Sequence, residues 1–134
     1  IGSDSQTKGS TGNQVITHNL GRVPRYINIS ASSAVDDGTV TLGLANSQGI
    51  YSDTNGTTTK QVVISSTASS TSAFGLRVVT QRSIIALFNT RGLSATSAEA
   101  VISAVTDNTF TLNWIFNRND SSGETSRQFI WTVW

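Results

Sequence analysis

Short stretches of alternating apolar and polar residues recur along this chain, and this period of two constrains the fold more than any other sequence feature. Every second side chain is apolar in residues 26–31, and residues 40–44 repeat the pattern. Residues 110–116 and 129–134 show it most strongly, through Phe110, Leu112, Trp114 and Phe116 in the first and Phe129, Trp131 and Val133 in the second. Because successive side chains of a β-strand point to opposite faces, each stretch predicts a strand with one buried face.

Further segments are expected to be strands although their pattern is less regular. A short strand is expected at residues 14–17, and residues 61–64 and 83–88 are compact apolar runs rich in β-branched residues, which favours buried strands. In residues 98–106 an Ala-Glu-Ala sequence could start a helix, but the β-branched residues that follow favour a strand. No segment carries a convincing helical stripe.

Turn signals separate these segments. They are Asp36-Asp37-Gly38, Asn55-Gly56, Asp107-Asn108 and an Asp-Ser-Ser-Gly sequence within residues 117–127, which predicts a hairpin loop between the last two strands. About eight short strands at this spacing predict an antiparallel sandwich or barrel, and we expect a single all-β sandwich. Residues 1–12 are polar and lack periodicity, so we expect a flexible N-terminal segment before a domain spanning residues 13–134.

The charge balance excludes some classes of partner. The 134 residues include 9 Lys and Arg against 8 Asp and Glu, which gives a formal net charge of +1. This balance gives no reason to expect nucleic acid as a partner. No apolar run approaches the roughly 20 residues needed to span a bilayer, so we expect no membrane insertion. The absence of Cys excludes disulfides and thiolate metal sites.

Residues that could carry chemistry are present but form no recognisable motif. His18 is the single His, and no partner set for a general base accompanies it. Asp36 and Asp37 lie at an expected turn, where Asp commonly bonds its own backbone. Residues 53–64 depart from a calcium loop because Ile64 occupies the position of the bidentate Glu. We therefore expect no enzyme, and no catalytic, cofactor-binding or metal-binding residues.

Two stretches resemble a known group of proteins. One, His18-Asn19-Leu20-Gly21-Arg22-Val23-Pro24, resembles the opening hairpin of many phage tail-fibre and virion-surface domains. The layout of the second is similar to the last half of a recurrent family of phage structural proteins; it comprises Ala98-Glu99-Ala100-Val101-Ile102-Ser103, then Asp107-Asn108-Thr109-Phe110-Thr111-Leu112-Asn113-Trp114 and an aromatic C-terminal strand. In outline the chain also looks like a jelly roll or the H-type lectin fold, a small antiparallel sandwich that assembles as trimers and binds sugars.

The resemblance implies a location on the surface of a virus particle. The chain would be a decoration, head-fibre or tail-fibre module of a bacteriophage that forms a homotrimer and contacts other virion proteins. The alternative is a lectin-like receptor-binding module that recognises bacterial surface glycans. A third interpretation is a carbohydrate-binding module cut from a cell-wall hydrolase, which would be a monomer.

The first of these stretches also predicts a structural turn from its own chemistry. Gly21 adopts a positive φ that other residues resist, and Pro24 fixes its own φ while it favours an extended Val23. We expect His18 to brace this turn through a ring nitrogen.

Several side chains are candidates for contacts with partners. Trp114, Phe116 and Trp131 share inward faces, which predicts core positions. Trp134 falls on the opposite face from Trp131 and is expected at a subunit interface or, as the alternative, at a sugar-stacking site; Trp131 and Arg127 are further interface candidates. Candidate ligand residues in loops are Tyr51, Asn55, Asn119 and Asp120.

Overall fold

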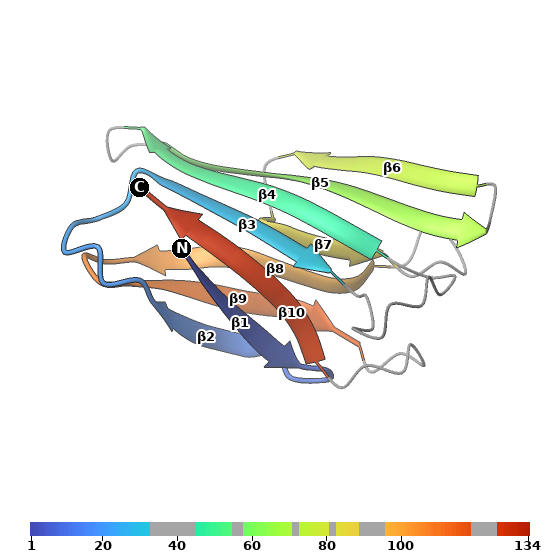
Figure 1. The fold of residues 1–134 in the computed structure, drawn as a ribbon, viewed down its shortest axis with the longest axis horizontal. Helices are drawn as coiled ribbons and strands as arrows, with labels where there is room; N and C mark the ends of the chain where they lie inside the picture. The colour runs from blue at the N-terminus through green and yellow to red at the C-terminus, as the bar shows by residue number, and fades with distance from the viewer. Residues whose placement is uncertain (33–44, 55–57, 71–72, 81–82, 89–95, 119–125) are drawn as a thin grey trace.

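Two facing antiparallel β-sheets make up the computed structural model of the chain (Figure 1). The structure describes residues 1–32, 45–54, 58–70, 73–80, 83–88, 96–118 and 126–134. Within these ranges there is no helix, and therefore no helix that could cross a membrane. The predicted all-β sandwich is confirmed.

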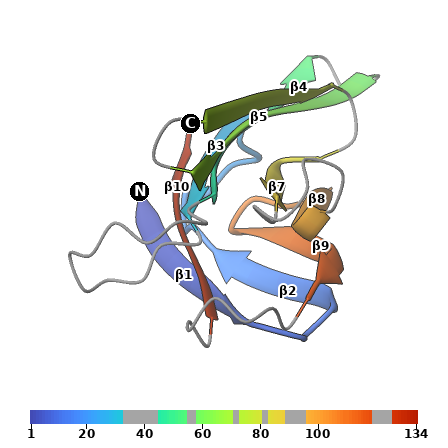
Figure 2. The ribbon, with the colours of Figure 1, turned by 90° about the vertical axis from the view of Figure 1, so that its right-hand side faces the viewer.

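The larger sheet has six strands in the order β1-β10-β3-β4-β5-β6. Their bounds are β1 (Gly2–Thr7), β10 (Ser126–Val133), β3 (Tyr26–Ser32), β4 (Ala45–Thr54), β5 (Thr58–Ser70) and β6 (Ala73–Thr80). The smaller sheet has the order β2-β9-β8-β7, with β2 (Gly12–Thr17), β9 (Thr109–Asn117), β8 (Thr96–Val105) and β7 (Ile85–Phe88). Figure 2 shows the six-stranded sheet curving around the smaller one.

The core lies between the inner faces of the sheets. The alternate apolar residues of β3 and β10 pack there against those of β9, as the period of two predicts. Phe110 meets Trp131 edge to face with ring centroids 5.7 Å apart, and Trp114 lies 6.1 Å from Phe129. Both of these contacts therefore join one sheet to the other.

The described residues contain ten strands rather than about eight. The prediction of a flexible N-terminal segment is wrong, because Gly2–Thr7 form β1 and pair with β10 along their whole length. The strands β4 and β6 were also not predicted. The sequences of β1 and β4 are dominated by Ser, Asn, Gln, Asp and Gly, so backbone pairing with neighbours defines these strands and no apolar alternation marks them.

A β-bulge changes the predicted face of Phe116. The register of β8 against β9 shifts between Glu99 and Ala100, which leaves Ile115 as an extra residue on β9. An extra residue reverses the alternation beyond it. Phe116 is therefore 47% exposed instead of lying in the core, and Asn117 takes the inward position.

Two other predictions need correction. The last two strands do not form a hairpin, because β9 belongs to the smaller sheet and β10 to the larger. The apolar run at residues 61–64 is not buried throughout: Val63 is in the core, but Val62 and Ile64 point outward from β5. The residues of the turn signals at 36–38 and 55–56 lie outside the described ranges, as do those of the strand expected at 40–44.

Candidate functional site

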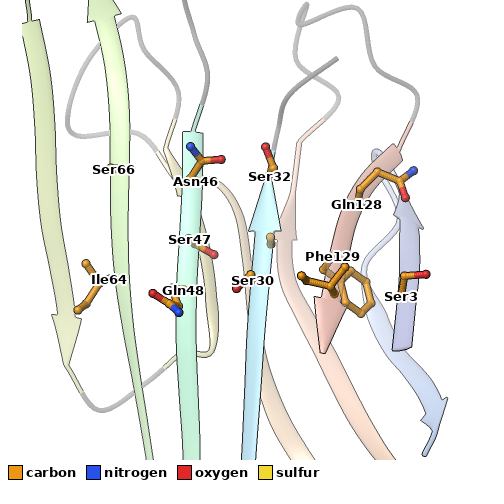
Figure 3. A pocket seen from close by; sticks show the side chains of 12 residues that line it. Ser3, Ser30, Ser32, Asn46, Ser47, Gln48, Ile64, Ser66, Gln128 and Phe129 are labelled. Atoms are coloured by element: carbon orange, nitrogen blue, oxygen red, sulfur yellow. The ribbon is translucent and has the colours of Figure 1, made fainter. Parts of the chain in front are cut away.

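The outer face of the six-stranded sheet carries a hollow with a volume of about 630 Å³ (Figure 3). It extends over five neighbouring strands, β1, β10, β3, β4 and β5. The hollow lies on the face away from the core, because most of the side chains that line it alternate along their strands with buried residues. Three buried residues, Ala31, Ser47 and Phe129, also border it. We call it the outer-face hollow.

Strand register arranges the lining side chains in two parallel rows. The central row runs across the sheet from Ser3 through Ile130, Ser30 and Gln48 to Ile64. The second row, two residues further along β3, consists of Gln128, Ser32, Asn46 and Ser66. Neighbouring strands lie about 4.8 Å apart, so adjacent members of a row can contact the same small ligand.

The lining is neutral and rich in hydrogen-bonding groups. None of the described residues that line the hollow is charged. Hydroxyl groups of Ser and carboxamides of Asn and Gln can each donate and accept hydrogen bonds. Ile64 and Ile130 are exposed and place aliphatic surface on either side of Ser30 and Gln48. The volume falls within the range of roughly 300–1,000 Å³ typical of small-molecule sites.

An exposed aromatic pair lies on the same face, near the start of β3. Trp134 donates its backbone N–H to the carbonyl of Tyr26 and accepts the Tyr26 N–H in return, both at 3.1 Å. The two rings stack with centroids 5.7 Å apart and 24° between their planes. Tyr26 is 39% exposed and Trp134 48% exposed, so the stacked pair presents ring surface to solvent.

The aromatic pair and the hollow share a face because of strand periodicity. Ile27 lies in the core, so Tyr26, Asn28, Ser30 and Ser32 alternate outward along β3. Ser30 is four positions after Tyr26, which places the aromatic pair about 13 Å from the central row of the hollow. Asn28 stands midway, and its buried Oδ1 accepts no hydrogen bond from the described residues.

The residues predicted to form a structural turn do so, away from this face. The backbone N–H of Leu20 donates to Nδ1 of His18 at 3.1 Å, so a ring nitrogen braces the turn. Gly21 has a φ of 72°, in the left-handed region, and Pro24 is fully buried. Asn19 also has a positive φ, which the sequence did not predict. The His18 ring stacks on Phe110, so it is held by the core rather than presented to a ligand.

The prediction that Arg127 and Trp131 lie at a subunit interface is wrong. Arg127 is fully buried and donates from Nη2 to the Arg118 carbonyl at 3.3 Å, and Trp131 belongs to the core. Neither side chain can contact a partner while the domain is folded. Trp134 does lie on the opposite face from Trp131, as its place in the alternation predicts.

The predicted ligand residues are not brought together. The prediction that Tyr51 lies in a ligand-binding loop is wrong: it lies within β4, where it points into the core and is only 5% exposed. It faces inward because it pairs across the sheet with Ile27, and both side chains share the inner face. The other three, Asn55, Asn119 and Asp120, lie outside the described residues.

A hydrogen-bonded side-chain pair lies at the smaller sheet, between Glu99 of β8 and Ser83 just before β7. The buried Ser83 donates from Oγ to a carboxylate oxygen of Glu99. His18, the single His of the sequence, packs on Phe110 and is not part of this pair. Among the described residues, no group of three or more His, Cys, Asp or Glu could hold a metal ion. The role that the Ser83–Glu99 hydrogen bond does have is structural: it connects β8 to the segment before β7.

Sequence reasoning missed the outer-face hollow although part of its signal is visible. The polar positions of the alternation in residues 26–31 mark Asn28 and Ser30 as outward-facing. Which side chains stand beside them depends on the register of β10, β4 and β5, and these strands are distant in sequence.

No family model matches the chain, and no curated protein or solved structure matches it either.

Proposed function

We propose that this chain is a non-enzymatic attachment module displayed on the surface of a bacteriophage particle, and that it attaches through the outer face of its six-stranded sheet. The observation that carries the proposal is the outer-face hollow, which is open, neutral and built from side chains of five adjacent strands. Such a surface suits recognition of another molecule, because each strand contributes a side chain to one continuous patch.

Recognition fits this surface better than catalysis does. General acid–base or nucleophilic catalysis needs a titratable or activated group at the reacting atoms. The described residues that line the hollow provide Ser hydroxyls, carboxamides and apolar groups, and no titratable side chain among them could act as a base for the hydroxyls. The placement on a phage particle rests on the resemblance of residues 18–24 and of the C-terminal strands to virion-surface domains.

Binding to intact bacteria tests the attachment role. Labelled protein is incubated with a panel of bacterial strains, and we expect it to bind a subset of them. Gln48→Arg should abolish this binding, because it places a bulky cation in the central row of the hollow. Asn13→Arg is the matched control, since Asn13 is also exposed but lies on β2 of the other sheet. Binding to no strain, or an equal loss in both variants, would contradict the proposal.

A second candidate role is assembly as a homotrimer, which the resemblance to the H-type lectin fold implies and for which the bulge on β9 offers a contact surface. The bulge leaves Ile115 and Phe116 exposed next to one another on the smaller sheet. Bulges commonly re-aim side chains, and here the two re-aimed side chains give an apolar contact that a second copy of the chain could cover. A trimer that uses this surface leaves the outer-face hollow open on the opposite sheet.

Solution mass tests this second role. We expect light scattering to give a mass near three times the 14.2 kDa chain, and Phe116→Ser to lower it towards one chain. Trp134→Ser serves as the comparison: if it dissociates the assembly and Phe116→Ser does not, the contact lies at the aromatic pair instead. A monomer at micromolar concentration would exclude the trimer.

A further inference from the structure

We infer that the outer-face hollow and the Tyr26–Trp134 pair together form one extended binding site for a neutral oligosaccharide that lies along β3. This inference deepens the proposed attachment role and rests on it. It names the chemical class of the ligand and adds the aromatic pair to the site. The predicted loop residues are not needed.

The hydrogen-bonding part of the site matches the chemistry of sugar hydroxyls. A sugar hydroxyl donates one hydrogen bond and accepts others, and it is best met by groups that also do both. Ser30, Gln48 and Ser32 are such groups, and they stand on the adjacent strands β3 and β4 in the middle of the hollow. The Oδ1 of Asn28, which has no donor among the described residues, lies between this part and the aromatic pair. A ligand hydroxyl beside β3 would provide a donor after a rotation of this carboxamide.

The apolar part of the site matches the C–H faces of sugar rings. Tyr26 and Trp134 stack on one another at an interplanar angle of 24°, so one face of each ring lies against the other ring, and the remaining exposed ring surface is available to a sugar. At the other end, Ile130 and Ile64 flank the polar centre of the hollow with exposed aliphatic surface. Sites for small polar molecules usually combine such apolar surface with a few convergent polar groups.

The distance between the two parts sets the size of the ligand. Tyr26 and Ser30 are four residues apart on one face of β3, which corresponds to about 13 Å. One sugar ring cannot reach across this distance. The site therefore requires a chain of several rings that runs along β3.

Charge and backbone pairing in the hollow argue against the competing ligand classes. An anionic polysaccharide would be expected to meet Arg or Lys, but none of the described residues that line the hollow is charged. An extended peptide binds most readily at an open sheet edge, where unpaired backbone groups add it as a further strand. Here β10, β3 and β4 are each paired on both sides, so the centre of the hollow offers side chains only.

Tryptophan fluorescence provides the direct test, because Trp134 is exposed whereas Trp114 and Trp131 are buried. The protein is titrated with oligosaccharides of increasing length from neutral glucans, galactans and mannans, and with anionic alginate oligosaccharides. We expect one neutral series to change the Trp134 emission, with affinity that rises up to three or four rings. The alginate series should have no effect.

Variants distinguish binding at this specific site from non-specific binding to the protein surface. Gln48→Ala and Trp134→Ala should each weaken binding of the neutral series at least tenfold, measured by calorimetry. Trp134→Phe should retain most of the affinity because it keeps an aromatic surface. Asn13→Ala, on the other sheet, should change nothing. Binding that survives both Gln48→Ala and Trp134→Ala, or that is limited to alginate, would overturn the inference.

The cell-binding assay distinguishes this inference from the proposed attachment role. If Gln48→Arg abolishes binding to cells and the neutral oligosaccharide competes with the cells, both hold. If Gln48→Arg abolishes cell binding, but no neutral oligosaccharide binds and protease treatment of the cells removes the target, the face recognises a protein; the attachment role then stands and the oligosaccharide site is refuted. If Gln48→Arg leaves cell binding intact, both are refuted.

Discussion

Among the described glycines for which the space around a Cβ is known, Gly49 has the least room for a side chain. A Cβ built on it would lie 1.8 Å from the carbonyl oxygen of Ile84 and 2.6 Å from the carbonyl carbon. The contact is backbone against backbone, so no flexible side chain can move aside. Gly49 thus lets β4 of the larger sheet approach the segment that leads into β7, next to the core.

We expect Gly49→Ala to lower the free energy of unfolding by about 3 kcal/mol or more, because β4 must shift while it is paired with both β3 and β5. Urea denaturation followed by circular dichroism measures this change. Gly21→Ala is the comparison: nothing lies within 4 Å of its Cβ, and only the positive φ opposes it, at about 1–2 kcal/mol. Equal urea midpoints for the two variants would show that β4 does not pack as closely as described.

Individual residues were predictable where their role is local. His18, Gly21 and Pro24 act within one short turn, and their chemistry alone indicates that turn. Arg127 and Tyr51 were placed wrongly because their environments come from distant segments. Arg127 meets the Arg118 carbonyl at the end of β9, and Tyr51 pairs with Ile27 on β3.

At the scale of the strands, one edge of β8 forms its backbone hydrogen bonds with a side chain instead of a neighbouring strand. The pairing of β7 with β8 extends to Ala100, and beyond it Gln61 of β5 takes over. Its Nε2 donates to the Ile102 carbonyl at 2.9 Å, and its Oε1 accepts the Ile102 N–H at 2.8 Å. One carboxamide therefore replaces a strand neighbour and joins the two sheets.

Gln61→Ala should lower the free energy of unfolding by about 1–3 kcal/mol, because it leaves a partly buried N–H and C=O without partners. Gln61→Glu should be similarly harmful, since a carboxylate cannot donate to the Ile102 carbonyl. Thermal and urea unfolding measure both. Gln128→Ala is the control: Gln128 is exposed, and among the described residues its side chain bonds the hydroxyl of Ser126 alone, so a change within about 0.5 kcal/mol is expected. A loss in Gln128→Ala as large as in Gln61→Ala would contradict the bridging role.

The bulge on β9 shows where pattern reasoning about an element stops. The alternation from Phe110 to Trp114 correctly predicts the inner face, and it fails at the next residue because Ile115 is inserted. No feature of residues 110–116 marks this insertion. It becomes visible only in the pairing with β8, where Glu99 lies opposite Phe116 and Ala100 opposite Trp114.

For the whole molecule, the sequence predicted the class of fold but not the assignment of strands to sheets. The last two strands are close in sequence, and a hairpin is the natural expectation for them, yet β9 and β10 lie in opposite sheets. The outer-face hollow has the same origin. Its polar side chains are ordinary outward positions of separate strands, and only the sheet order places them side by side.

The N-terminal residues give the sharpest test of this arrangement, because the sequence predicts a flexible segment and the structure contains β1. Gly2 fits directly beneath the Trp131 ring, where a Cβ would lie 2.3 Å from the nearest ring carbon. If β1 belongs to the fold, deletion of residues 1–7 must uncover Trp131 and leave β10 as a sheet edge.

We expect this deletion to cost about 2 kcal/mol or more of stability, through lost burial of the indole and lost strand pairing. In a Trp134→Phe background, it should also shift tryptophan emission to longer wavelength. Removal of Ile1 alone, which is 90% exposed, should change neither property. Unchanged stability and emission after deletion of residues 1–7 would mean that Trp131 is shielded without β1. The six-stranded sheet would then lose its β1 edge, and the central row of the hollow would begin at Ile130 rather than Ser3.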